Sequence, residues 1–265
     1  MSSKNKKQEV IHTKIWREEP EPDNPFAAKK CFCAGYDVYG DLLGKASWAE
    51  YLYLLFKLEK PTKQQAKLLE TIAVAIANPG IRDHSVRAAM NAGVGGSTSA
   101  SALISSLAVG AGQYTGAREV YLLMENWQQL GVDINNWDRC INASNENTAP
   151  DIWPDITHFP GFDSNADTCA TPILQVLDIC AEIDDSGVLK WLKENRSVLE
   201  NYVGSPLSMV GVISAAFHSL GFSSSQGEML FLLLRLPGAA VHALEQREHG
   251  WRKYPFFGEA LKYKE

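Results

Sequence analysis

The chain has 265 residues, 45% of them hydrophobic and 21% charged, and a formal net charge of −6. A protein that follows nucleic-acid phosphates needs a basic face, so this acidic balance excludes nucleic acid as the main partner. The hydrophobic fraction excludes a disordered chain, and the length suffices for one large core or for a main domain with a smaller one.

The cysteines favour a reducing compartment. They are odd in number and irregularly spaced, at positions 31, 33, 140, 169 and 180, which predicts free thiols and a cytoplasmic location rather than a disulfide framework. Cys31-Phe32-Cys33 is too tight for a zinc site and has no second pair, so we expect no metal. No apolar segment follows the basic N-terminus or approaches about eighteen uninterrupted residues, so we expect neither a secretory signal nor contact with a membrane.

The first part of the chain changes character near residue 31. Residues 1–30 are polar and contain several prolines, which predicts a flexible, extended arm that is either a mobile tail or docked on a partner subunit. Beyond them lie two capping boxes, Ser47 with Glu50 and Thr62 with Gln65. These boxes predict helices that run to Leu58 and Ala77.

Residues 77–127 hold the most informative pattern. Asn78-Pro79-Gly80 is a turn signal that ends the preceding helix, and the charged Arg82-Asp83-His84 follows it. Residues 97–111 are mostly small, with large apolar side chains at helical spacing, and predict a helix that packs closely on its neighbours. After a glycine-bracketed break, Arg118-Glu119 opens another helix.

The second half combines one irregular region with several helices. Residues 127–160 mix polar and aromatic residues without a helical period, which predicts a long ordered loop or lid, and loops of that length are usually functional. Further helices are expected over 171–182 and 188–194, from Ser205-Pro206 to residue 220, and from the serines at 223–225 to about residue 238. Strand patterns are nearly absent, so the expected fold class is all-α.

Three blocks in this order carry a family resemblance: residues 35–70, the small-residue helix with the turn and GAREVYLLM (97–124), and RLPGAAVHALEQREHGWRKYPFF (235–257). They resemble the citrate synthase superfamily, and its short citryl-CoA lyase-like branch in particular. The resemblance implies a citrate synthase-like fold with a large helical domain, residues 31–126 and 206–265. It also implies a smaller inserted helical domain, residues 127–205, that includes the lid-like loop.

The resemblance also implies an activity, but the chain departs from the family at the active site. Family members that make or cleave citryl-CoA use one histidine to polarise the thioester, a second to hold the oxo acid, and an aspartate to move the α-proton. Here Tyr114 stands in place of the first histidine, and Gly161-Phe162-Asp163-Ser164 in place of the segment with the second. Ser208-Met209-Val210 aligns with Asn-Val-Asp, which places a valine at the base. Asp167-Thr168-Cys169 replaces an Asp-Pro-Arg segment.

We therefore expect replacement catalytic residues. Tyr114 is the candidate donor to the thioester oxygen, because a hydroxyl can act as an oxyanion-hole donor does. Asp163 or His158 is the candidate acid or base. The alternative for Asp163 is an Asx turn with Ser164 and Asn165.

The candidate substrate-binding residues are Arg82, His84, Ser164, Arg235, His242, Arg252 and Lys253. Arg235 matches the family arginine that holds the substrate carboxylate, since its planar fork suits a bidentate partner. Either Arg252 or Lys253 matches the closing arginine that reaches the neighbouring subunit. The alternatives are a helix-end cap for Arg235, a core histidine for His242, and a helix N-cap for Asp83-His84-Ser85.

Two functions remain open at this point. The first is an enzyme that makes or breaks a carbon–carbon bond next to an acyl-CoA carbonyl. Its other substrate is a small carboxylate or carbonyl compound other than oxaloacetate, and coenzyme A is a substrate rather than a covalently bound cofactor. The second is a non-catalytic homologue that binds acyl-CoA or pairs with a catalytic paralogue. We expect a homodimer, with a heteromeric complex as the alternative.

Overall fold

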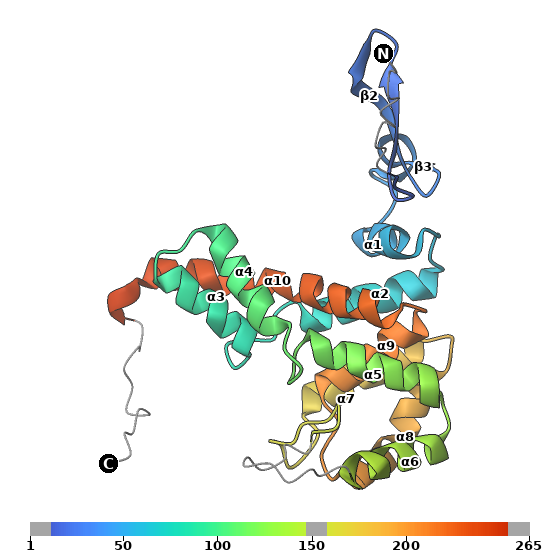
Figure 1. Cartoon of the computed structure of the whole chain (residues 1–265), viewed down its shortest axis with the longest axis vertical. Coiled ribbons are helices and arrows are strands. Elements are labelled where there is room, and N and C mark those ends of the chain that lie inside the picture. The colour runs from blue at the N-terminus through green and yellow to red at the C-terminus, as the bar shows by residue number, and fades with distance from the viewer. Residues whose placement is uncertain (1–11, 147–157, 254–265) are drawn as a thin grey trace, which may run out of the picture. The chain divides into compact units, whose positions relative to one another are not determined.

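The computed structural model of the chain describes residues 12–146 and 158–253 (Figure 1). It divides into two compact units, Met1–Ala66 and Lys67–Glu265. The predicted domain boundaries at residues 126 and 206 both fall inside the second unit, so the large and small domains stay a prediction.

The first unit begins with a small antiparallel sheet of order β1-β2-β3, formed by Arg17–Glu21, Asn24–Cys33 and Tyr36–Asp37. Residues 17–30, for which the sequence predicted an extended arm, thus lie in two paired strands and their turn, and the flexibility of the arm stays a prediction. Arg17 lies opposite Phe32 in the ladder, and its guanidinium carbon is 4.0 Å from the centre of that ring. This cation–π pair links the charged first strand to the apolar end of the second.

Helices follow the sheet where the capping boxes predicted them. After a short turn of π-helix, η1 (Val38–Leu42), come α1 (Trp48–Lys57) and α2 (Lys63–Ile76). At the start of α1, the Glu50 carboxylate accepts a hydrogen bond from the Ser47 amide at 2.7 Å, and the Ser47 hydroxyl accepts one from the Glu50 amide at 3.2 Å. Thr62 and Gln65 exchange the same pair of bonds before α2, so both capping boxes are confirmed.

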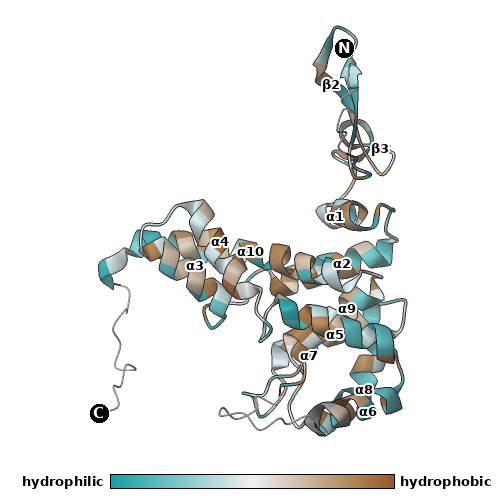
Figure 2. Cartoon of the chain, viewed as in Figure 1, coloured by the Kyte–Doolittle hydropathy of each residue, from teal (hydrophilic) through white to brown (hydrophobic). Residues whose placement is uncertain are grey.

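The second unit is helical. Its further helices are α3 (His84–Val94), α4 (Ser99–Gly110), α5 (Ala117–Leu130), α6 (Ile134–Glu146), α7 (Thr171–Ile183), α8 (Val188–Val203), α9 (Met209–Ser219), α10 (Ser224–His249) and the short 3-10 helix η2 (Trp251–Lys253). Helix α10 packs against α3, α4, α5 and α9 and is the centre of the unit. Helix α9 and the middle of α10 are mostly hydrophobic (Figure 2).

Helix α10 does not end near Gly238, as the sequence predicted, but continues to His249. Pro237 has no amide hydrogen to donate, and the Gly238 amide donates to the carbonyl of Ala77, just beyond α2, at 2.8 Å. A Cβ at position 238 would lie 2.6 Å from that oxygen. The Pro-Gly pair therefore marks a close approach between chain segments rather than a helix end.

Residues 134–146 form helix α6, so the prediction of a loop over the whole of 127–160 is wrong there. Trp137 and Ile141 are each only 1% exposed, and with Ile134 they form one apolar stripe at helical spacing. Three polar residues between them, Asn135, Asn136 and Asp138, obscured this period. The remainder of the predicted lid, residues 147–157, lies outside the described residues.

One described helix, α10, is long and apolar enough to cross a membrane by length and composition alone. It packs against other helices of its unit, and Arg235 in its middle is buried with a counter-charge. These are the properties of a core helix in a globular unit.

Candidate functional site

A cavity of about 270 Å³ lies in the second unit. Its wall is formed by helix ends and by the segments that precede helices: the end of α2, the residues before α3 and α5, the loop before α7, and the starts of α7 and α9. Helix α10 completes the wall. The lining residues are Ala75, Ile76, Pro79, Asp83, Thr115, Asp163, Ile173, Ser208, Met209, Val210, Phe231 and Arg235. Most of its wall is apolar. Its charged groups are Asp83, Asp163 and Arg235, so carboxylates outnumber cations.

Arg235 is buried, with 8% of its surface exposed, and its charge is already matched within the chain. One guanidinium nitrogen forms an ion pair with Asp83, and another donates to the Thr115 carbonyl at 3.3 Å. Asp83 is also the N-cap of α3, because its carboxylate accepts hydrogen bonds from the Ser85 and Val86 amides. The N-cap alternative for Asp83 is thus confirmed, and the helix-end alternative for Arg235 is wrong because α10 continues beyond it.

The loop with the predicted catalytic aspartate is held between α5 and α9. The Gly161 amide donates to the Glu119 carboxylate at 2.8 Å, and the Gly161 carbonyl accepts from the Ser208 amide at 2.9 Å. The Asp163 amide donates to the Pro206 carbonyl at 2.8 Å. Because residues 206–208 pair with this loop, α9 begins at Met209 with Ser208 as its N-cap, not at Pro206 as predicted.

Glu119 is a buried carboxylate beside the candidate site that the sequence analysis did not single out. It is 1% exposed, and its second oxygen accepts a hydrogen bond from the Thr115 amide at 2.5 Å. A buried carboxylate needs such partners, because burial without them is costly. Glu119 precedes Leu123 and Trp127 by four and eight residues on α5, so the helical period could have placed it on the buried face.

His158 lies beside this carboxylate. Its Nε2 is 3.2 Å from Oε1 of Glu119, and 10% of its side chain is exposed. The Glu119 carboxylate holds the pKa of His158 above its ordinary value; burial opposes this shift, and the charge of Asp163 adds to it. The Tyr114 ring contacts the imidazole edge-on, with ring centres 5.4 Å apart. Glu119, His158 and Tyr114 are thus neighbours in that order, but neither Tyr114 nor His158 lines the cavity, whereas Asp163 does.

Asp163 has two roles in the geometry. One carboxylate oxygen accepts a hydrogen bond from the Asn165 amide at 2.9 Å, which is the Asx turn considered as the alternative. Asp163 also lines the cavity, together with Val210, the residue that the resemblance aligns with a family aspartate. A carboxylate absent from α9 is thus present on another wall of the same cavity.

The other predicted binding residues do not line the cavity. Arg82, His84, Ser164, Arg252 and Lys253 are exposed. His242 is partly buried; its Nε2 lies 3.2 Å from the Asn78 side-chain oxygen, and its Nδ1 is 3.6 Å from Glu245. Among residues 12–146 and 158–253, no group of three His, Cys, Asp or Glu side chains could hold a metal ion.

Solved structures identify the fold. A citryl-CoA lyase from Hydrogenobacter thermophilus superposes with a TM-score of 0.75 and 20% identity, over 97% of this chain and 95% of that one. This chain has the citrate synthase-like fold. An ATP citrate lyase from Methanothrix soehngenii, solved with citrate and coenzyme A, superposes with a TM-score of 0.70 and 20% identity. The match covers 98% of this chain and 42% of the ATP citrate lyase chain.

A citrate synthase from Thermoplasma acidophilum superposes with a TM-score of 0.62 and 19% identity. The match covers 83% of this chain and 59% of the citrate synthase chain. No protein-family model matches the chain, and no curated protein matches it. The fold predicted from the sequence is confirmed.

Proposed function

We propose that the chain is an acyl-CoA-dependent carbon–carbon lyase or synthase with a non-standard active site in the cavity of the second unit. The observation that carries this proposal is the presence of Asp163 in the same cavity as Val210. A carboxylate near a thioester α-carbon can move the α-proton, and the similarity to solved citryl-CoA lyase and citrate synthase structures supports a thioester as the substrate.

In the synthetic direction, Asp163 removes a proton from the α-carbon of the acyl-CoA, while the Tyr114 hydroxyl donates a hydrogen bond to the thioester oxygen. The α-carbon then forms a bond to the carbonyl carbon of the second substrate, and the new alkoxide takes a proton from protonated His158. The raised pKa of His158 favours the protonated form that this step needs. Cleavage follows the same steps in reverse.

The second substrate is a small carbonyl compound without a carboxylate at the end that faces Arg235. An incoming carboxylate would compete with Asp83 for the guanidinium and would lie near the negative charges of Asp83 and Asp163. Like charges in a partly buried cavity repel. Oxaloacetate carries two carboxylates and fits such a cavity poorly.

A non-catalytic homologue that binds acyl-CoA, or that pairs with a catalytic paralogue, is the second candidate. Val210 favours it, because a valine stands where the family has its base. The engagement of Arg235 by Asp83 favours it too, because that pair stabilises the fold with no ligand present.

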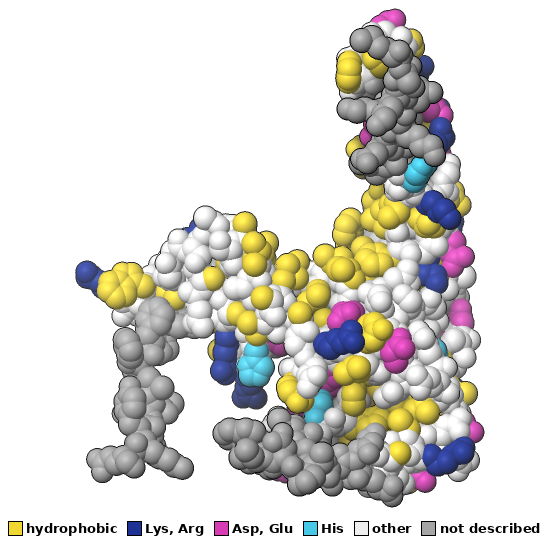
Figure 3. Space-filling model, in the orientation of Figure 1, with side chains coloured by type: hydrophobic (Ala, Val, Ile, Leu, Met, Phe, Trp, Pro, Cys, Tyr) yellow, Lys and Arg dark blue, Asp and Glu magenta, His cyan; other side chains and the backbone are white. Residues whose placement is uncertain are grey.

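We further propose that the chain is a cytoplasmic homodimer. Large apolar side chains are exposed on α4 and α10: Ile104, Val109, Met229, Leu233, Val241 and Leu244. Figure 3 shows hydrophobic surface in the region of these helices. Those on α10 recur at roughly helical spacing and form a stripe along one side. Exposed stripes of this kind are typical of protein–protein contacts.

The decisive experiment is calorimetric titration of the purified chain with free CoA, acetyl-CoA, and branched and aromatic acyl-CoAs, with the molar mass measured by light scattering. Exchange of the α-protons of bound acyl-CoA in D₂O is then followed by NMR. We expect binding that depends on the acyl group, a dimeric mass, and exchange that Asp163→Asn slows by about 100-fold, as loss of a general base does. Neutral ketones and aldehydes, and not oxaloacetate, should be consumed or released.

Asp167→Asn is the matched control, because Asp167 is exposed on the same loop and does not line the cavity. Acyl-CoA binding without α-proton exchange would select the non-catalytic candidate. A folded protein that binds no CoA species would contradict both catalysis and CoA binding.

A further inference from the structure

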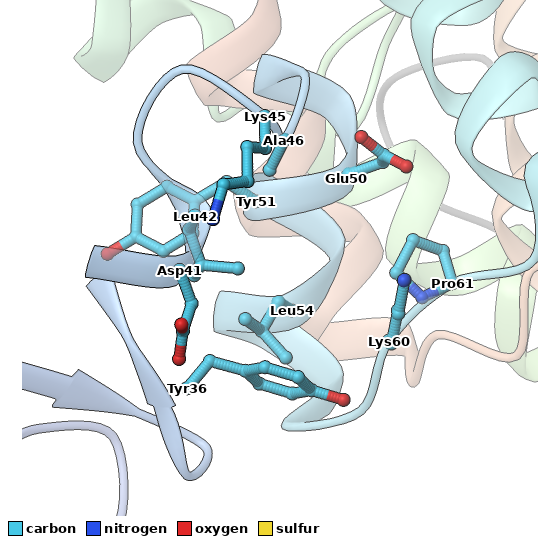
Figure 4. Close-up of a pocket in the computed structure, with 10 residues that line it drawn as sticks. All are labelled: Tyr36, Asp41, Leu42, Lys45, Ala46, Glu50, Tyr51, Leu54, Lys60 and Pro61. Atoms are coloured by element: carbon cyan, nitrogen blue, oxygen red, sulfur yellow. The ribbon is translucent and has the colours of Figure 1, made fainter. Parts of the chain in front are cut away.

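The first unit holds a cavity of its own, of about 430 Å³. It is formed by the end of the sheet, η1, α1 and the segment after α1, and its lining residues are Tyr36, Asp41, Leu42, Lys45, Ala46, Glu50, Tyr51, Leu54, Lys60 and Pro61 (Figure 4). All of them belong to residues 36–61. The volume is within the range of about 300–1,000 Å³ typical of small-molecule sites.

The wall of this cavity is mainly apolar. Leu54 and Pro61 are buried, Leu42 and Ala46 are partly buried, and Tyr36 contributes its ring (Figure 4). Tyr51, also partly buried, contributes a second ring, and burial raises the pKa of its hydroxyl, which therefore stays a neutral donor. Such a wall suits a ligand with an apolar or aromatic body.

The charges around the cavity are not equally available. Asp41 accepts a hydrogen bond from the Asp37 amide at 3.1 Å, and Glu50 accepts one from the Ser47 amide at 2.7 Å. Both carboxylates therefore already hold backbone partners that shape the turn and the helix start.

The lysines differ from the acids. Lys45 donates only to the Gly40 carbonyl, at 3.3 Å, and Lys60 has no hydrogen bond or ion pair among the described residues. In that part of the chain, neither ammonium lies within 4.0 Å of a carboxylate. Figure 4 shows Lys45 and Lys60 on different sides of the cavity, on the segments before and after α1. Two ammonium groups that form no ion pair thus face one mainly apolar space, and the Asp41 and Glu50 carboxylates on its wall already accept backbone hydrogen bonds.

We propose that this cavity binds a small monocarboxylate with an aromatic or branched body. The carboxylate would lie between the ammonium groups of Lys45 and Lys60, and the body would pack against Leu54, Pro61 and the tyrosine rings. A single negative charge fits better than a phosphate, because Asp41 and Glu50 also line the cavity and would repel a dianion. The site is separate from the cavity of Asp163 and does not depend on the function proposed for it.

The test is an amide chemical-shift titration of the ¹⁵N-labelled full chain with 4-phenylbutyrate, its neutral amide, and inorganic phosphate. We expect saturable shifts within residues 36–61 for the carboxylate, and affinities roughly tenfold weaker for the amide and for phosphate, as loss of a charge-assisted contact or added repulsion would give. Lys45→Ala and Lys60→Ala should each weaken carboxylate binding by a similar factor. Lys63→Ala, which removes the same charge from an exposed position outside the cavity, should not.

Four results would overturn the proposal. They are no saturable shift at millimolar 4-phenylbutyrate, equal binding of acid and amide, tighter binding of phosphate, and affinity unchanged by both cavity lysine variants. Unchanged spectra of the unliganded variants outside residues 36–61 would show that the fold is intact, so that a loss of binding reports on the site.

Discussion

The two cavities handle positive charge in opposite ways. In the second unit, Arg235 is buried and paired with Asp83, and two carboxylates line the space with it. In the first unit, Lys45 and Lys60 line a more apolar space, and the nearby carboxylates are occupied by backbone amides. Arg235 is thus part of the folded framework, whereas the lysines are available to a ligand. A cation in a cavity predicts an anion site only when its charge is not already matched within the chain.

The largest expected effect is the loss of stability when the buried, paired Arg235 is replaced. Arg235→Met should lower the free energy of unfolding by about 3–5 kcal/mol, because removing one partner of a buried pair leaves the other charge uncompensated. Urea denaturation measures the change. Arg118→Met is the matched control: Arg118 lies 3.7 Å from Glu228 with 46% of its side chain exposed, so the loss there should be below about 1 kcal/mol. Equal losses in the two variants would mean that Arg235 is free to hold a substrate carboxylate.

A smaller effect, dependent on pH, is expected from Glu119→Gln. We expect a loss of about 1–3 kcal/mol, because the Gly161 and Thr115 amides donate to different oxygens of Glu119. The single side-chain oxygen of Gln can accept from only one of them, and its NH2 group leaves the other amide without an acceptor. The Glu119–His158 interaction raises the folded pKa of His158 above its unfolded value. Its contribution is therefore fully present below the unfolded pKa, near 6.5, and is lost as pH rises through the folded pKa.

The measurement is denaturant unfolding of the parent chain and Glu119→Gln between pH 5.5 and pH 8.5. The stability difference should be larger at the lower pH. Glu228→Gln, in a partly exposed ion pair that contains no histidine, serves as the control and should show no such trend. A difference independent of pH would mean that His158 is not held by this charge.

The smallest change in stability is expected when a lysine of the cavity in the first unit is replaced. Lys60→Ala should change the free energy of unfolding by no more than about 0.5 kcal/mol, because its ammonium has no partner in the described residues and the residue is exposed. Thermal and urea unfolding of the unliganded chain measure it. A loss above about 1 kcal/mol would show that the chain itself uses this charge, and the contrast between the cavities would fail.

Local signals in the sequence predicted much of the helical fold. The capping boxes at Ser47 and Thr62 start helices as predicted, because their hydrogen bonds join residues only three positions apart. Helix α6 was missed because polar residues separate Ile134, Trp137 and Ile141. The end of α10 was misplaced because the partner of Gly238 is Ala77, which no local pattern can reveal.

The candidate site was predictable only in part. Asp163, Arg235 and the segment with Val210, which the resemblance placed in the active site, line one cavity, and their roles stay a prediction. The pairing of Arg235 with Asp83 was not predictable, because it depends on how α3 meets α10. Glu119 could have been found from its spacing to Leu123 and Trp127, since a carboxylate on a buried helix face needs specific partners.

The ion pair of Arg235 and Asp83 also orders events during synthesis of the chain. Its partners are 152 residues apart, so Asp83 has no counter-charge until α10 has left the ribosome and packed against α3. The wall of the Asp163 cavity therefore forms late in folding, because contacts between distant segments form only after those segments have met. Fragments that end before residue 235 should expose Asp83 and the apolar face of α3, and should be targets for chaperones and proteases.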